Sequence, residues 1–211
     1  MADQKRQYRK RRRAELEQQT RQRITESTVE LHGTLGPSRT TISAVAEHAG
    51  VRRSTVYRHF PDEAALFAAC TEHWMALNAP PDLAAWAAIK DPEQRLATAL
   101  EQLYAYYRRT DPMMENLHRD EQTMPIVKQL FGGFRQYVSA AHQTLMIGQT
   151  ARGRGRHQVR AAIGHALAFP TWRSLTGEQQ LDDSQAAELM RRLVTAAAAP
   201  PANKRKPSRH P

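Results

Sequence analysis

Apolar residues recur along this chain at the three- and four-residue spacing of helices, and no segment shows the alternation typical of a β-strand. Near the N-terminus the repeat is Ile24, Thr28 and Leu31, in a helix that we expect to run from Ala14 to about Gly33. The same spacing continues almost to the C-terminus. The pattern therefore predicts an all-α protein.

Two short helical segments follow, separated by a glycine. The apolar face of the first consists of Ile42, Val45, Ala46 and Ala49. Thr40 or Thr41 is suited to cap its N-terminus, and Gly50 lies where glycine commonly ends a helix. The second short helix is expected over about 53–60, with Val51 filling the space between the two.

A fourth helix is predicted to begin at Pro61-Asp62-Glu63, because proline and acidic residues favour the first turn of a helix. Its buried face would hold Leu66, Phe67, Cys70 and Trp74. The segment 78–81 (Asn-Ala-Pro-Pro) marks a break in composition, and we place a domain boundary there.

The rest of the chain also has a helical pattern. We expect helices that begin near Pro92, Pro112 and Pro125, a loop over 148–155, a helix from about His157 to Phe169, and a last helix that begins near Asp183. Pro170 should bend or end the helix that precedes it.

The formal net charge of +10 is concentrated at the two ends. Residues 1–60 hold 13 Lys and Arg against six Asp and Glu, and residues 200–211 hold four basic residues and no acid. Residues 61–199, with 14 basic residues against 15 acids, are nearly neutral. A basic end on a neutral body favours a polyanionic partner, most often nucleic acid. We expect residues 1–13 to be a disordered basic arm and residues 200–211 a disordered, solvated tail.

Composition excludes several classes of protein. The longest apolar stretch, Leu83–Ile89, is far shorter than the ~20 residues of a membrane-spanning helix. The basic N-terminus has no apolar segment behind it, so it does not resemble a secretory signal. A single cysteine, Cys70, excludes an intramolecular disulfide. We therefore expect a soluble, cytoplasmic protein.

The two short helices joined through Ala49-Gly50-Val51 have the pattern of a helix-turn-helix, although a plain helical hairpin with a basic face has the same periodicity. In a helix-turn-helix the second helix lies in the major groove, and its N-terminal residues meet the base edges. An Arg guanidinium can donate two hydrogen bonds to a guanine, and hydroxyl groups bind bases or phosphates.

The segment TTISAVAEHAGVRRSTVYRHFPDEAALF (residues 40–67) resembles the DNA-binding signature of the tetracycline-repressor (TetR) family of bacterial transcription regulators. The resemblance covers about residues 20–74. It implies a three-helix DNA-binding domain, which we assign to residues 14–76, and a larger helical domain for a ligand and for dimerisation, which we assign to residues 77–199.

The resemblance also implies which residues contact DNA. Thr40, Thr41, Tyr57 and His59 should contact phosphate, and Arg53, Ser54 and Thr55 should face the bases. The full set that we predict is Arg39, Thr40, Thr41, Arg52, Arg53, Ser54, Thr55, Tyr57, Arg58 and His59.

The chain departs from the family pattern at three positions: it has Arg52 where a small capping residue is common, Ser54 where glycine is common, and Glu63 where a phosphate-binding lysine is usual. The basic arm could supply the missing anchor by following the DNA backbone or entering the minor groove.

The larger domain is expected to bind an unknown small-molecule effector. The candidate lining residues are Trp86, Tyr104, Tyr107, Met113, Met114, Leu117, His118, Phe131, Phe134 and Trp172. Most aromatic and Met residues at helical spacing are simply core, so about a third of these should touch a ligand. Helices at about 157–174 and 184–198 are expected to form a homodimer, which would read a palindromic operator.

The sequence thus favours a ligand-responsive DNA-binding regulator, and most of that family are repressors. Two other interpretations compete with it. An enzyme is disfavoured, since no catalytic, cofactor or metal-binding spacing is found, including at His118–Asp120. A constitutive or nucleoid-type DNA-binding protein would keep the helix-turn-helix and fill the ligand site with core side chains.

Overall fold

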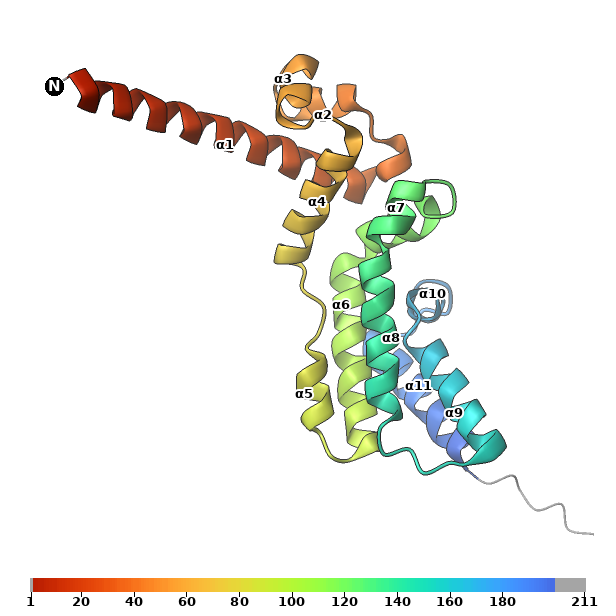
Figure 1. Ribbon diagram of the computed structural model, residues 1–211. Helices are drawn as coiled ribbons and strands as arrows, with labels where there is room; N and C mark the ends of the chain where they lie inside the picture. Colours follow the sequence, from red (N-terminus) through yellow and green to blue (C-terminus); the bar gives the residue numbers. More distant parts are fainter. Residues whose placement is uncertain (1, 200–211) are drawn as a thin grey trace, which may run out of the picture. The chain divides into compact units, whose positions relative to one another are not determined.

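The computed structural model describes residues 2–199, which contain helices, turns and loops and no β-strand (Figure 1). These residues form two compact units. The first contains the chain up to Ala79 together with Thr110–Arg135, and the second contains Pro80–Arg109 and the chain from Gln136 onward. The expected all-α fold is confirmed. The residues 200–211 of the predicted tail lie outside the described part of the chain.

The first unit is built on the N-terminal helices. It contains α1 (Ala2–Thr34), the 3₁₀ turn η1 (Pro37–Arg39), α2 (Ile42–His48), α3 (Arg53–His59), α4 (Glu63–Leu77), the end of α6 (Pro92–Asp120), α7 (Pro125–Leu130) and the start of α8 (Gly132–Met146). Helices α1 to α4 enclose a core made of Ile24, Val45, Ala46, Ala49, Val56, Phe60, Leu66 and Cys70. We call this cluster the helix-turn-helix core.

The second unit contains α5 (Leu83–Ala88), most of α6 and α8, α9 (Gly153–Ala166), α10 (Phe169–Arg173), the π-helical turn η2 (Ser174–Glu178) and α11 (Asp183–Ala198). Helices α9 and α11 pack along each other. The Tyr104 hydroxyl donates to the Ala166 carbonyl at 2.9 Å, and the Trp172 indole donates to the Asp183 carboxylate at 2.9 Å. Buried aromatic residues thus tie α6 to the C-terminal helices.

The predicted disorder of the basic arm is wrong for residues 2–13, which are the first turns of the 33-residue helix α1. Lys and Arg are good helix formers, and two pairs at i, i+4 spacing support the helix. Arg11 lies 2.9 Å from Glu15, and Arg13 lies 3.1 Å from Glu17. The charge run therefore extends a helix that the packed C-terminal half of α1 has already nucleated.

Two helix boundaries in the middle of the chain also differ from the prediction. Helix α6 continues through Pro112, which was expected to begin a new helix. Proline removes one helical hydrogen bond, and buried residues on both sides, Tyr107 and Met114, keep the helix intact. The segment from Pro125 forms two helices instead of one, because α7 ends at Leu130, just before the pair Gly132-Gly133.

The compact units do not follow the predicted domain boundaries. The break after residue 76 was placed close to the end of the first segment at Ala79, but residues 110–135 pack with the N-terminal helices. The first unit is therefore larger than a three-helix DNA-binding domain. The sequence contains no sign of this, since helical periodicity does not say which helices pack together.

Candidate nucleic-acid interface and cavity

The turn between α2 and α3 is fixed by its backbone. Thr41 caps α2 by accepting a hydrogen bond from the Ala44 amide at 3.1 Å. At the other end Gly50 has a φ of 63°, and the Val51 amide donates to the Ala46 carbonyl at 2.9 Å. This is the hydrogen bond of a Schellman motif, which glycine forms without the steric cost that a side chain would add. The turn therefore sets the direction in which α3 begins.

Helix α3 has one buried face and one exposed face. Val56 and Phe60 are both 1% exposed and pack into the helix-turn-helix core. The exposed side chains are Arg52, Arg53, Ser54, Tyr57 and Arg58, while Thr55 and His59 are half-buried. Five of the ten predicted DNA-contacting residues are thus exposed at the start of α3 or along it, and we call Arg52, Arg53, Ser54, Tyr57 and Arg58 the α3 surface.

The two threonines before α2 are not equivalent. The Thr40 hydroxyl donates its proton to the Gly36 carbonyl at 2.8 Å, so it has none left for a phosphate oxygen. The exposed Thr41 oxygen accepts from Ala44, and its own proton remains available. Thr41 is therefore the better phosphate donor of the pair. Arg39, at the end of η1, is also exposed.

Helix α1 holds the end of α3 through Arg21. Its guanidinium donates to the His59 carbonyl at 2.5 Å and lies 4.1 Å from the centre of the Phe60 ring. Burial, followed by the charges of Arg58 and Arg21, lowers the pKa of His59. The ring is therefore neutral near pH 7, and its Nε2 is buried with no hydrogen-bond partner among the described residues.

The N-terminal turns of α1 carry a basic face made of Lys5, Arg6, Arg9, Lys10 and Arg13, all of them exposed. Residues 18 positions apart are separated by about five helical turns and point the same way. Arg6 and Lys10 therefore share the direction of Ile24 and Thr28, which are buried on the side where α2 and α3 pack. We call this set of five residues the α1 basic face.

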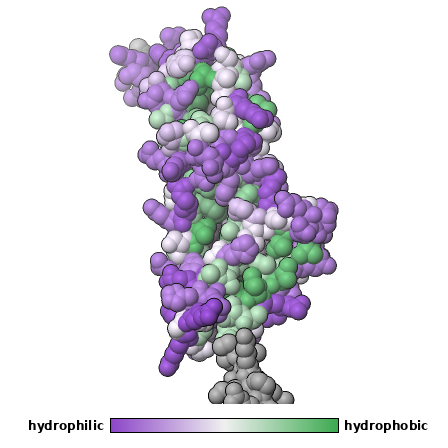
Figure 2. Space-filling model, turned by 90° about the vertical axis from the view of Figure 1, so that its right-hand side faces the viewer, coloured by the Kyte–Doolittle hydropathy of each residue, from purple (hydrophilic) through white to green (hydrophobic). Residues whose placement is uncertain are grey.

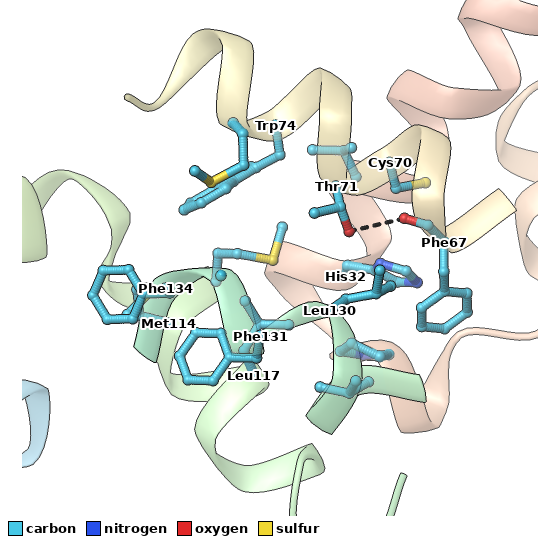
Figure 3. A pocket seen from close by; sticks show the side chains of 16 residues that line it. His32, Phe67, Cys70, Thr71, Trp74, Met114, Leu117, Leu130, Phe131 and Phe134 are labelled. Atoms are coloured by element: carbon cyan, nitrogen blue, oxygen red, sulfur yellow. Dashed lines mark hydrogen bonds between the residues drawn. The ribbon is translucent and has the colours of Figure 1, made fainter. Parts of the chain in front are cut away.

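The first unit also encloses a cavity of about 160 Å³ (Figure 3). It is lined by Val29, His32, Pro37, Phe67, Cys70, Thr71, Trp74, Met75, Met113, Met114, Leu117, Val127, Leu130, Phe131, Gly133 and Phe134. Side chains of α1 and α4 form one wall, and side chains of α6, α7 and the start of α8 form the other. Every lining residue belongs to the first unit.

Five of the ten predicted ligand-binding residues line this cavity: Met113, Met114, Leu117, Phe131 and Phe134. Another four are core residues of the second unit: Trp86, Tyr104, Tyr107 and Trp172. His118 bonds to the Met114 carbonyl at 2.9 Å and packs against Phe131, next to the cavity. The candidates thus fall into two groups, one at the cavity of the first unit and one in the core of the second unit, and they do not form a single site.

Sequence reasoning missed the wall contributed by α1 and α4, above all His32, Thr71 and Trp74. Their helical spacing fits an ordinary core face of the helix-turn-helix, so no local signal distinguishes them. Over residues 2–199 no cluster of His, Cys, Asp or Glu has the make-up of a metal site. Within the same range no helix is both long enough and apolar enough to span a membrane.

Residues 24–70 match the family model for bacterial regulatory proteins of the tetR family. The fold is similar to that of a Clostridium perfringens protein proposed to regulate fatty acid metabolism, with a TM-score of 0.62 and 12% identity over 83% of this chain and 97% of that chain. A TetR-like transcriptional regulator from Rhodococcus sp. has a TM-score of 0.60 and 18% identity over 83% of this chain and 93% of that chain. A tetR-family regulator from Streptomyces coelicolor has a TM-score of 0.55 and 20% identity over 85% of this chain and 79% of that chain. None of the curated proteins compared matches the sequence of this chain.

The family match spans the part of the chain that builds the helix-turn-helix: most of the packed half of α1, both short helices and the first turns of α4. The shared fold extends over most of the described residues. Residues 24–70 therefore form a DNA-binding domain of the tetR family of bacterial regulatory proteins, and the chain is a DNA-binding regulator of transcription.

Proposed function

We propose that this protein acts in the cytoplasm as a repressor, which binds a palindromic operator as a homodimer and is released by a small-molecule effector. The observation that carries the proposal is the α3 surface, where Arg53, Ser54 and Tyr57 stand exposed on a helix held by Val56 and Phe60. The match of residues 24–70 to the tetR family of regulatory proteins supports the interpretation as a transcriptional regulator.

Base recognition is assigned to the N-terminal turn of α3. The Arg53 guanidinium can donate two hydrogen bonds to a guanine, and the Ser54 hydroxyl can reach a neighbouring base or phosphate. Tyr57, which is 47% exposed one turn further on, is placed to donate to a phosphate oxygen. The contacts from Thr41 and Arg39 would hold the start of α2 on the same backbone.

The α1 basic face is proposed to bind phosphates beside the half-site. Arg6 and Lys10 of this face share the direction of Ile24 and Thr28 on the buried side of α1, where α2 and α3 pack. Twelve helical residues extend about 18 Å, enough to follow several phosphates outside the recognised bases. This face would take the place of the lysine that the family usually carries where this chain has Glu63.

Helices α9 and α11 are proposed to form the dimer interface. Leu189 and Leu193 on α11 are 41% and 42% exposed, and α9 adds the exposed Ala161. Figure 2 shows an apolar area on the face where these helices lie, just above the grey C-terminal residues. Two copies joined there would present two α3 helices, which a palindromic operator requires.

The direct test is selection of bound fragments from random DNA, followed by sequencing. A repressor of this kind enriches a pseudo-palindrome with half-sites about one helical turn or more apart. Absence of an enriched motif, with binding that disappears in moderate salt, would instead indicate a non-specific DNA-binding protein.

Two variants then test how α3 is used. Arg53→Ala should relax the base preference at one position per half-site and cost about 1–3 kcal/mol of binding free energy. Tyr57→Phe should weaken binding about equally for all sequences, because it removes a hydrogen bond to a phosphate. An unchanged preference in Arg53→Ala, measured by repeating the selection, would contradict the placement of α3 in the groove.

A further inference from the structure

The cavity of the first unit has a lining without formal charge. None of its 16 lining residues is Lys, Arg, Asp or Glu. Aromatic side chains contribute much of the surface, and three methionines, Met75, Met113 and Met114, add flexible apolar contacts that can adapt to different shapes. An ion placed here would lose its hydration without gaining a counter-charge, which is strongly unfavourable. The occupant that fits this lining is uncharged and mostly apolar.

One polar group of the lining lacks a partner. His32 is 5% exposed, and its Nε2 is buried without a hydrogen bond from any described residue. The nearby Thr71 hydroxyl is already used, since it donates to the Phe67 carbonyl at 2.9 Å (Figure 3). Burial lowers the pKa of His32 to about 4, so at neutral pH the ring is uncharged, with one N–H and one acceptor nitrogen. A buried polar atom left unpaired is unfavourable, and a bound molecule that supplies a hydrogen bond could recover this cost.

We propose that this cavity is the effector site and that it takes a small, uncharged, predominantly apolar ring compound with one hydrogen-bonding group, which pairs with His32. The size is appropriate, because an apolar cavity of about 150 Å³ can hold a benzene ring. The role of the site in regulation rests on the proposed function, whereas binding of the compound in the cavity is independent of it.

The position of the cavity connects it directly to the DNA-binding helices. Cys70 belongs both to the cavity wall and to the helix-turn-helix core, and Val29 lines the cavity and packs against that core. The opposite wall is connected as well. Helix α6 supplies Met114 to the lining, and its last residue, Asp120, accepts a hydrogen bond from the Ser38 amide of η1 at 2.9 Å.

A compound between these walls would therefore contact α1 and α4 on one side and α6 on the other, without any intervening helix. It changes DNA affinity only if it binds more tightly to one arrangement of these helices than to another. The proposal accordingly separates into two measurable parts, binding to the cavity and its effect on operator affinity.

Binding is tested without DNA, by isothermal titration of the full-length protein with three bicyclic compounds of similar shape. Indole is neutral and carries one N–H donor, benzothiophene is neutral and carries no donor, and indole-2-carboxylate is an anion. We expect indole to bind between about twofold and tenfold more tightly than benzothiophene, the worth of one hydrogen bond. Indole-2-carboxylate should not bind measurably. Failure of both neutral compounds, or equal binding of the anion, would overturn the proposal.

Variants then locate the site. His32→Leu should abolish the preference for indole over benzothiophene, and His32→Gln should restore part of it. Leu130→Trp, which fills the cavity from the half-buried Leu130 of α7, should abolish binding of both compounds. Leu77→Trp is the matched control, because Leu77 is 70% exposed and does not line the cavity. Circular dichroism checks that each variant is folded. A preference for indole that survives in folded His32→Leu would overturn the role of His32.

The regulatory part is measured by fluorescence anisotropy with a selected operator duplex. Saturating indole should change operator affinity at least severalfold in the wild type and not in Leu130→Trp. If indole binds in the cavity and the operator affinity is unchanged, the cavity is a ligand site without a regulatory role, and its assignment as the effector site is overturned. If no operator can be selected at all, the proposed function fails while the titration with indole still decides on the cavity.

Discussion

Glu63 lies in the first turn of α4, directly after Asp62, which caps the helix by accepting a hydrogen bond from the Ala65 amide at 2.7 Å. Two carboxylates at this end suit the helix dipole and stabilise the fold. They are unfavourable for a phosphate, and the family resemblance implies a phosphate-binding lysine at this position. We therefore expect Glu63 to favour helix stability over DNA affinity.

Glu63→Lys is therefore expected to tighten operator binding severalfold. The slope of log K against log salt should become steeper by about 0.9, the value for one additional neutralised phosphate. Anisotropy titrations at several salt concentrations measure both quantities. Glu72→Lys is the control, since Glu72 is exposed on the same helix but more than two turns away. An equal gain in both variants would mean that only net charge matters.

His32 predicts a dependence of stability on pH. Its pKa is about 4 in the folded protein and near 6.5 when unfolded, so the unfolded state takes up the proton first as the pH falls. The contribution of the buried neutral ring is fully present above about pH 6.5 and is lost progressively between pH 6.5 and 4. Between pH 7 and 5 the free energy of unfolding should fall by about 2 kcal/mol from this group.

Urea unfolding of the wild type and of His32→Leu at pH 7 and pH 5 measures this contribution. The variant should lose about 2 kcal/mol less than the wild type over this interval, because the other titrating groups are common to both proteins. Equal losses in the two proteins would show that His32 titrates normally and is not held neutral by burial.

At the scale of the helices, the N-terminal turns of α1 give a prediction about DNA binding. Removal of residues 1–13 should weaken operator binding and lower the salt slope by about 0.9 for each phosphate that the shortened helix no longer neutralises. The single variant Arg9→Gln, on the α1 basic face, should lower the slope by about 0.9. Arg11→Gln should leave it unchanged, because Arg11 lies outside the α1 basic face and is paired with Glu15. A slope that does not respond to the deletion would exclude the α1 basic face from the complex.

The helices that sequence reasoning predicted well are those with local signals at their ends. Thr41, Gly50 and Asp62 act through hydrogen bonds or backbone angles within a few residues of themselves. The helix boundaries that were predicted wrongly depend on residues further away in the chain. Pro112 stays inside α6 because of packing around it, and residues 2–13 are helical because they extend a helix anchored further along. Neither cause can be seen in a window of a few residues.

At the scale of the whole molecule, the proposed dimer interface gives a further prediction. Leu193→Glu places a charge in the apolar surface of α11 and should convert a dimer into a monomer, because burying an unpaired carboxylate is costly. Light scattering after gel filtration measures the mass. Leu77→Glu, at an equally apolar but more exposed position on α4, should remain dimeric. A dimer that persists in Leu193→Glu would move the interface away from this face.

Packing between distant segments of the chain explains why only part of the cavity lining was among the predicted residues. The predicted residues Met113, Met114, Leu117, Phe131 and Phe134 line a cavity, and their contact with a ligand stays a prediction. The wall formed by His32 and Trp74 depends on residues 110–135 packing with the N-terminal helices, which are far away in the sequence. The buried aromatic residues of the second unit, such as Tyr104, have the same composition and spacing but fill a core.

The shared wall of the cavity also has a consequence for how this protein can diverge. Substitutions at Val29 or Cys70 that reshape the cavity also disturb the helix-turn-helix core, so most of them should be eliminated by selection for folding. Leu130 and Phe134, on α7 and α8, line the cavity and take no part in that core. New chemical preferences should therefore arise by mutation of the α7–α8 wall, while the α1–α4 wall changes slowly among descendants of this protein.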